Sequence, residues 1–504
     1  MEITVFKKKV DLMKIKELII SILGIYCLLM TMIYLIDGQN QLYQTLKDIW
    51  YAKAFFMFAA FMVVIQRVRF FNWQSLVVSV LYWPFGYMYR EARGFAPDLF
   101  NRDKVVVWIV WLFLMIVVDM FVYKKHTPLE KFNKNGLAVF AAMTTFLIFY
   151  RNGRNYPIVL VMAMIFYLIP MGAKKWSHVV NQFCYAHLAA FAVMLYRSLL
   201  NNPEVDPYSG RWYGDFLNIG DFGLFLGQVV AVVLYKLYLI KKEKGRKNIE
   251  YIFWMISLLP VMWAVFRVST ITCYIGIIFI FLMGFVAIRK EVTIKNALFR
   301  LVSVTIGVIV AGIAGFLALK GLANLDIDYW DYMLLEGNVF VKTFANLVHR
   351  AHYMFNETRT FAECGIFDPD SIVNYVDLFT SGRLSIIKVF SEYFNFTGNP
   401  STGYYVGEYF AHNTHNTYSQ LIFDYGYIGG GLFIIWLLYS MVASVVGYIK
   451  EKQHSMVFVC IWMAMLLGIL LGESASLYYP IMVMTVLVMY PLIVKVEKKN
   501  EEVL

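Results

Sequence analysis

Long apolar segments recur along almost the whole chain, and they restrict its fold more than any other feature. A helix needs about 20 mainly apolar residues to cross the hydrocarbon core of a bilayer. Fourteen segments approach or reach this length, and they predict a polytopic membrane protein. They cover residues 17–36, 50–65, 75–89, 105–123, 137–150, 157–172, 178–199, 219–240, 250–265, 269–288, 297–319, 431–449, 456–472 and 477–494.

The spans are expected to be helical, which makes the fold class all-α. Backbone groups inside hydrocarbon must be paired within the segment, and a helix achieves this for each span separately. Segments 75–89, interrupted by Pro84, and 137–150 are short, so counts of twelve to fourteen spans remain open. A soluble globule is excluded, because 60% of the residues are hydrophobic and only 16% are charged.

Basic residues between the spans predict the orientation, since loops on the cytoplasmic side carry the excess of Lys and Arg. Placing the N-terminus inside puts most of the basic loops on the cytoplasmic face, with the loop at 90–104 as the exception. The cytoplasmic groups are Arg67 and Arg69, Lys124 to Lys134, Lys174 and Lys175, Lys241 to Lys247, Arg289 to Lys295, Lys450 and Lys452, and Lys495 to Lys499. Both termini are then cytoplasmic.

This orientation leaves one long segment, residues 320–430, on the extracytoplasmic side. Loops of such length are usually functional. Amphipathic stretches at 340–352 and 384–394 predict short helices within it. We therefore divide the chain into spans 1 to 11 over residues 1–319, this loop, and spans 12 to 14 with the cytoplasmic C-terminus over residues 431–504.

The net charge of +11 and the five cysteines point to no additional function. Lys and Arg occur in short runs between apolar segments, which is a topology signal and not a nucleic-acid-binding surface. The cysteines are scattered, so neither a disulfide framework nor a cysteine metal site is predicted.

The most polar segment beside a span lies at the end of the long loop. There His412 and His415 are each followed by Asn, and four glycines over residues 426–431 precede a long apolar run. An imidazole at a membrane boundary is a candidate proton acceptor near neutral pH. A zinc site would need a third ligand, for which Glu408 and Asp424 are candidates, but the spacing of known zinc motifs is missing.

One spacing in this segment resembles a family signature. His415-Asn416, nine residues, Gly426, two residues and Gly429 is similar to the H-N-x9-G-x-x-G pattern of the O-antigen ligase and O-antigen polymerase superfamily. These are integral membrane glycosyltransferases that use glycans linked to polyprenyl diphosphate. The resemblance implies that His415 acts on the acceptor hydroxyl, with Asn416 and His412 in supporting roles.

Three arginine elements extend the resemblance over residues 205–440. Ser381-Gly382-Arg383 resembles the family's S-G-R element, and Arg267-Val268-Ser269 resembles its S-R-T-G element with the glycine replaced. Arg211-Trp212-Tyr213-Gly214 with Asn218 resembles its R-x-x-G element. A guanidinium binds phosphate oxygens in a bidentate manner. The expected diphosphate-binding residues are therefore Arg267, Arg383 and Arg211, and the resemblance implies no metal and no cofactor.

Two acidic residues fall within or at the end of spans. Asp119 lies inside the fourth span and Glu473 ends the thirteenth, and ionisable groups in spans are often paired. Either acid is expected to hold an arginine in place, but the sequence names no partner. The loop acids Asp368, Asp370 and Asp377 are candidate bases in a rival scheme, although most loop acids are expected to be solvated.

The resemblance implies an inverting transferase of a bacterial cytoplasmic membrane with an extracytoplasmic active site. Transfer to another lipid-linked repeat unit would make it a polymerase of O-antigen or capsular polysaccharide. Transfer to lipid A-core would make it an O-antigen ligase. We favour the polymerase, because the long Tyr-rich loop leaves room for a growing glycan. A lipid-linked glycan flippase is the alternative of another class, and chain-length regulators and flippases are candidate partners. No nucleic acid is expected.

Overall fold

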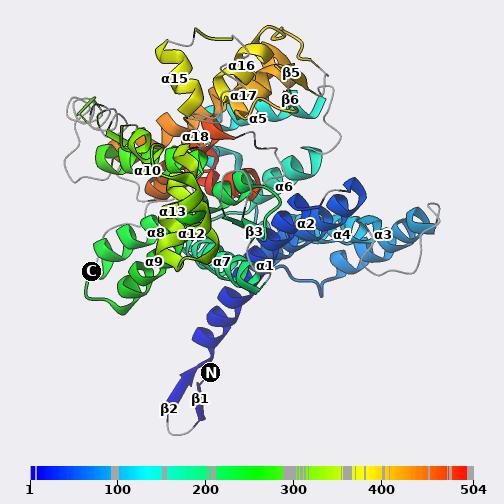
Figure 1. The fold of residues 1–504 in the computed structure, drawn as a ribbon. Helices are drawn as coiled ribbons and strands as arrows, with labels where there is room; N and C mark the ends of the chain where they lie inside the picture. The colour runs from blue at the N-terminus through cyan, green and yellow to red at the C-terminus, as the bar shows by residue number, and fades with distance from the viewer. Residues whose placement is uncertain are drawn as a thin grey trace. The chain divides into compact units, whose positions relative to one another are not determined.

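Helices account for most of the structure, a computed structural model of the chain (Figure 1). Eight helices in the described part of the chain are long and apolar enough to cross a membrane. The expected class, an all-α membrane protein, is confirmed, while the count of fourteen spans remains a prediction. The structure describes residues 2–5, 8–41, 43–91, 102–149, 156–200, 204–205, 212–268, 270–287, 302–303, 306, 310, 314–315, 317–352, 355, 366–368, 371–379, 382–399, 403–407, 409–451, 455–473, 475 and 480–496.

The chain forms two compact units. Unit 1 contains Met1–Leu137, Asn155–Val193 and Leu477–Leu504, and unit 2 contains Ala138–Arg154 and Met194–Ser476. The predicted division at residues 319 and 430 concerns the membrane topology and stays a prediction. The predicted span at 297–319 lies mostly outside the described residues.

Unit 1 joins the N-terminal helices to the C-terminal end of the chain. Its elements are β1 (Glu2–Val5), β2 (Lys8–Asp11), α1 (Leu12–Gln39), α2 (Gln44–Gln66), α3 (Trp73–Glu91), α4 (Arg102–Val122), α6 (Tyr156–Leu168), α19 (Pro480–Val488) and α20 (Tyr490–Ile493). The Tyr167 hydroxyl donates to the Val486 carbonyl at 2.9 Å, and the Tyr490 hydroxyl donates to the Ile169 carbonyl at 2.7 Å. The last apolar segment, predicted as one span, is divided into α19 and α20 before Pro491, whose ring nitrogen cannot donate to a helix.

Unit 2 holds the other spans and the polar segment of interest. Its elements are β3 (Glu204–Val205), β4 (Trp212–Gly214), α8 (Ile219–Glu243), α9 (Ile249–Val268), α10 (Ile271–Ala287), α12 (Ile327–Glu336), α13 (Val339–His352), α15 (Ile372–Phe379), α16 (Arg383–Ser391), β5 (Tyr404–Val406), β6 (Tyr409–Ala411), α17 (Thr417–Glu451) and α18 (Ser455–Gly472). Two helices, α5 (Lys134–Phe149) and α7 (Ala173–Leu200), have residues in both units. The helices expected at 340–352 and 384–394 are confirmed as α13 and α16.

Helix α18 forms the buried centre of unit 2. It packs against α8, α10 and α17, and most of its side chains are buried. A Cβ on Gly468 would lie 2.9 Å from the Ile275 carbonyl oxygen, and one on Gly472 would lie 2.8 Å from Thr272 Cα. Such close contact between backbones is typical of small residues four apart in membrane helices. The glycines therefore fix α10 against α18 just before residue 473.

Helix α17 is two helices joined at a bend. Gly426 has φ 72° and ψ 178°, a conformation that is accessible essentially to glycine alone. A Cβ at this position would collide with the Phe396 carbonyl oxygen. The first glycine of the signature is therefore required by the backbone, because the bend brings the short leading helix against residues 396–398.

Candidate functional site

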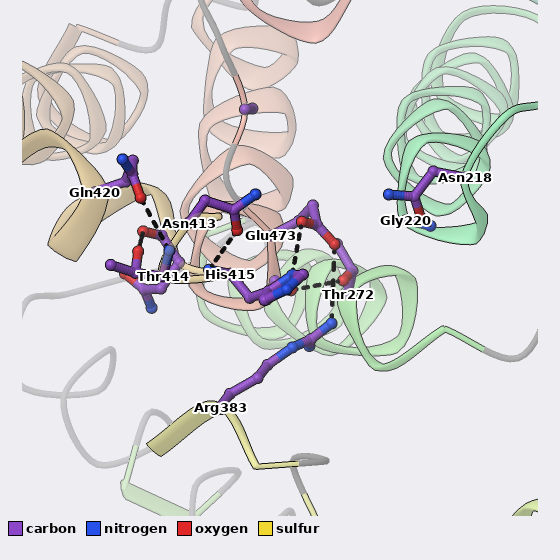
Figure 2. Close-up of polar contacts among 12 residues, drawn as sticks. Asn218, Gly220, Thr272, Arg383, Asn413, Thr414, His415, Gln420 and Glu473 are labelled. Carbon is purple, nitrogen blue, oxygen red and sulfur yellow. Dashed lines mark hydrogen bonds and ion pairs between the residues drawn. The ribbon is translucent and has the colours of Figure 1, made fainter. Parts of the chain in front are cut away.

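The side chains of His415 and Arg383 meet the same carboxylate, that of Glu473 (Figure 2). His415 Nδ1 lies 3.4 Å from Glu473 Oε1, and Arg383 Nη2 lies 3.8 Å from Glu473 Oε2. The Glu473 side chain is 8% exposed, whereas that of His415 is 28% exposed. The three residues form a histidine–glutamate–arginine cluster with the imidazole on its accessible side.

The backbone around His415 is held in an unusual conformation. His415 has φ 48°, in the left-handed region that costs a residue with a side chain about 1–3 kcal/mol. Its N–H donates to Asn413 Oδ1 at 2.9 Å, and the N–H of Thr414 donates to Gln420 Oε1 at 2.9 Å. These bonds stabilise the turn, so the imidazole points toward Glu473 and not along the following helix.

The residues after His415 bind the turn to the end of α18. Asn416 Oδ1 accepts the N–H of Ser419 at 3.1 Å and so caps α17, while its Nδ2 donates to the Leu471 carbonyl at 2.9 Å. The Thr417 hydroxyl donates to the Glu473 carbonyl at 2.6 Å. Asn416 therefore holds the His415 turn beside Glu473 in the described structure, while its supporting role in catalysis stays a prediction.

Glu473 follows the last residue of α18 and lies against the first turn of α8. A Cβ on Gly220 would collide with Glu473 Oε2, so only glycine leaves room for the carboxylate there. Asn218 caps α8 by accepting the N–H of Gly220 at 2.7 Å. The positive end of a helix dipole stabilises a nearby anion. Glu473 therefore lies beside the positive end of the α8 dipole as well as beside Arg383.

Arg383 is positioned by Asp377. The Asp377 carboxylate accepts the N–H of Ser385 at 3.0 Å and the Ser385 hydroxyl, and its backbone carbonyl accepts the N–H of Gly382 at 2.9 Å. Gly382 has φ 76°, which explains the glycine of the S-G-R element. Asp377 is 2% exposed, so the expectation that this loop acid is solvated was wrong. Its carboxylate caps the helix that begins with Arg383.

One nitrogen of the Arg383 guanidinium, Nη1, is left to bind a ligand. Burial lowers the pKa of Arg383, and Glu473 opposes that shift. Arginine nevertheless stays protonated in proteins. Among the described residues, the buried Nη1 has no hydrogen-bond partner. A buried, charged N–H without a partner is a suitable donor for an anionic oxygen.

Arg267 lies in the same unit, at the end of α9. It is 8% exposed, its carbonyl accepts Asn346 Nδ2 at 3.0 Å, and its Nη1 has no partner in the described part of the chain. The turn after it brings Thr270 against Gly223 of α8, and Thr272 donates to the Gly472 carbonyl at 3.0 Å. Arg267 itself lies in the last turn of α9, and its contact in the described part of the chain is with Asn346 of α13.

The other predicted residues are either separate from the cluster or outside the described part of the chain. His412 is exposed, with its ring 4.9 Å from that of Phe410, and it makes no contact with Glu473 in the described structure. Arg211 falls outside the described residues, as do Glu408 and Asp370. Asp119 binds an arginine only through the backbone, because its Oδ1 accepts the N–H of Arg69 at 3.1 Å. No group of three His, Cys, Asp or Glu side chains suited to a metal occurs within the ranges that the structure describes.

The sequence missed two features of this site. The partner of Glu473 was unknown from sequence, and it is Arg383 together with His415. Asp377 was considered only as a candidate base, and its contact with Ser385 gave no signal, since an acid and a serine eight residues apart are common in any loop. Comparison with family models finds no match for this chain, and neither a curated protein nor a solved structure matches it.

The geometry combines two chemical abilities. A carboxylate beside an imidazole orients the ring and stabilises the imidazolium that forms when the ring takes a proton. Buried guanidinium groups with a spare N–H stabilise negative charge that develops on a bound group. The cluster can therefore remove a proton from one reactant while holding an anionic portion of another.

Proposed function

We propose that this chain is a glycosyltransferase of a bacterial cytoplasmic membrane that acts on the extracytoplasmic face. The observation that carries the proposal is the contact of His415 and Arg383 with the two oxygens of Glu473. The proposed donor is a glycan on polyprenyl diphosphate. The proposed acceptor is a hydroxyl of a second lipid-linked glycan, so the product is a longer O-antigen or capsular polysaccharide.

His415 is the proposed general base. Its Nδ1 faces Glu473, which leaves Nε2 to accept the proton of the acceptor hydroxyl. The acceptor oxygen bonds to the anomeric carbon as the bond from that carbon to the phosphate oxygen breaks. The electron pair leaves with polyprenyl diphosphate, the proton goes to His415, and the configuration of the anomeric carbon inverts.

The arginines are the proposed diphosphate ligands. Arg383 and Arg267 each keep a buried Nη1 without a partner among the described residues, and each can bind a phosphate oxygen. Negative charge on the leaving diphosphate grows in the transition state, so fixed guanidinium groups lower the barrier. Arg211 is proposed as a third ligand from the resemblance alone.

Reconstitution of glycan transfer tests the proposal. The purified chain in lipid nanodiscs is mixed with lipid-linked glycan, with and without EDTA, and products are resolved by mass. We expect chain extension that survives EDTA and falls about 10²–10⁴-fold in His415→Ala, the range for loss of a general base. The matched control is His126→Ala, because His126 is exposed and belongs to unit 1.

The same assay separates the alternatives. An unchanged rate in His415→Ala would refute the assigned base. Transfer to added lipid A-core, without extension of lipid-linked glycan, would identify a ligase. A transporter would be identified if vesicles took up the lipid-linked glycan without any transfer and if His415→Ala showed the same uptake.

A further inference from the structure

Three polar groups without partners belong to residues at the contact of α13 with α9. They are Arg267 Nη1, Asn346 Oδ1 and His349 Nδ1, and none has a hydrogen-bond partner in the described part of the chain. Arg267 is 8% and Asn346 1% exposed, so bulk water has little access to these two side chains. Buried polar groups are rarely left unpaired in folded proteins, and these three atoms are therefore candidate contacts of a bound molecule.

The positions of these groups are fixed by contacts within unit 2. Asn346 Nδ2 donates to the Arg267 carbonyl at 3.0 Å, which joins α13 to the end of α9. His349 is three residues further along α13 and therefore on the same helix face. Its Nε2 lies 3.1 Å from Asp331 Oδ1 of α12. Figure 1 shows α12 and α13 as neighbouring helices.

The hydrogen-bonding types of the three groups restrict the ligand. Arg267 offers a charged donor, and Asn346 Oδ1 is an acceptor. Asp331 Oδ1 lies 3.1 Å from Nε2 of His349 without forming a hydrogen bond, and its negative charge favours the neutral tautomer with the hydrogen on Nε2. In that tautomer Nδ1 is a second acceptor. A bare phosphate or diphosphate presents acceptors only and would satisfy Arg267 alone. The complementary ligand carries an anionic oxygen with hydroxyl or amide donors close to it.

We propose that Arg267, Asn346 and His349 form a subsite for the sugar attached to the diphosphate, with Arg267 on the phosphate and α13 on the sugar. The inference rests on the proposed function and deepens it, because it makes Asn346 and His349 specificity-determining residues for the donor. A phosphate with neighbouring hydroxyls occurs in a sugar diphosphate and also in phosphatidylglycerol. The test below separates these two sources.

Binding to two probes tests the subsite in the full chain. The probes are polyprenyl diphosphate and the same lipid carrying N-acetylglucosamine, titrated into nanodiscs of phosphatidylcholine. We expect the parent to bind the glycosylated probe at least tenfold more tightly. Asn346→Leu keeps the side-chain size but removes the bond to the Arg267 carbonyl, so it should lose about tenfold for the glycosylated probe and clearly less for the bare lipid. A tenfold change is about 1.4 kcal/mol.

Two further variants distinguish a specific loss of the subsite from a general disturbance of α13. His349→Phe keeps a ring and leaves the bond between Asn346 and Arg267 intact, so we expect about threefold loss for the glycosylated probe only. Arg267→Gln should weaken the binding of both probes. The control is His126→Phe, which should bind as the parent does. Equal weakening of both probes in Asn346→Leu and in His349→Phe would overturn the subsite.

The outcomes also distinguish this inference from the proposed enzyme. If the parent transfers no glycan but Asn346→Leu still loses the preference for glycosylated lipid, the enzyme fails and the subsite stands. If transfer is normal and Asn346→Leu keeps both the preference and the donor KM, the subsite fails alone. Competition by phosphatidylglycerol nanodiscs that depends on Asn346 would assign the groups to bulk lipid and overturn the donor subsite.

Discussion

Replacing Glu473 by Gln removes the charge that joins His415 to Arg383 and keeps the size of the side chain. At 3.4 Å, a carboxylate and an imidazolium attract each other by about 5 kcal/mol at an effective dielectric constant of about 20. The His415 side chain is 28% exposed, so solvent screening reduces this attraction to about 3–4 kcal/mol. This corresponds to a fall in kcat of about 10²–10³-fold.

The loss is expected in kcat and not in the donor KM. In the proposed mechanism the imidazolium forms as the acceptor proton is transferred, so the carboxylate would stabilise the transition state more than the bound substrates. In Glu473→Gln, Arg383 also loses its carboxylate partner, and the donor KM should stay the same or fall. The assay is single-turnover and steady-state glycan transfer in nanodiscs, with retention of fold checked by thermal unfolding.

Two controls make this prediction specific. Glu473→Asp keeps the charge on a shorter side chain, so it should recover part of the lost rate. Glu392→Gln is the matched neutral change at an exposed residue after α16, and it should leave the rate within about twofold, as for surface substitutions. If Glu473→Gln keeps kcat within about threefold of the parent, the carboxylate does not support the base, and the reasoning is refuted.

Three further outcomes follow from the described contacts. Gly426→Ala should destabilise the fold by about 2–4 kcal/mol and lower the unfolding temperature, because alanine would be strained at this φ and would collide with the backbone. Gly431→Ala is the control, because Gly431 has open space around it and the change should not lower the unfolding temperature. Asp377→Ala should lower kcat/KM by about tenfold, since loss of a helix cap costs about 1 kcal/mol and frees Arg383, and Asp377→Asn should recover part of it. In whole cells, a membrane-impermeant maleimide should label His412→Cys, whereas His126→Cys should react only after the membrane is opened. The reverse labelling pattern would show that the topology is opposite to the predicted one.

The labelling experiment is simplified by the native cysteines. Cys27, Cys184, Cys273 and Cys460 are buried thiols. Cys364 lies outside the described residues and is replaced by Ser beforehand. Any labelling of the Cys364→Ser chain, which carries no new cysteine, is subtracted before the labelling at positions 412 and 126 is interpreted.

Much of the helical architecture follows from the sequence because apolar length specifies a span directly. Helices such as α8 and α18 correspond to the predicted segments 219–240 and 456–472. The hairpin of β5 and β6 was not predicted, although aromatic residues and Val406 on either side of Gly407, which has φ 62°, are a recognisable strand–turn–strand pattern.

The site was predicted only in part, because sequence spacing reports local contacts. His415 and Arg383 were found through motifs, and one glycine of each motif, Gly426 and Gly382, has a positive φ. Their meeting at Glu473 is a long-range contact between separate elements, which no periodicity encodes. The burial of Asp377 was missed for the same reason, since it depends on how α15 packs beside α16.

The glycine contacts between α10 and α18 limit which positions near Glu473 can vary. Gly468 and Gly472 leave no volume for a larger side chain. Helix α13 differs, because outward positions such as Phe344 are exposed and meet no such limit. For the proposed glycosyltransferase, directed evolution toward other sugars should therefore accept more changes on the exposed face of α13 than at Gly468 or Gly472.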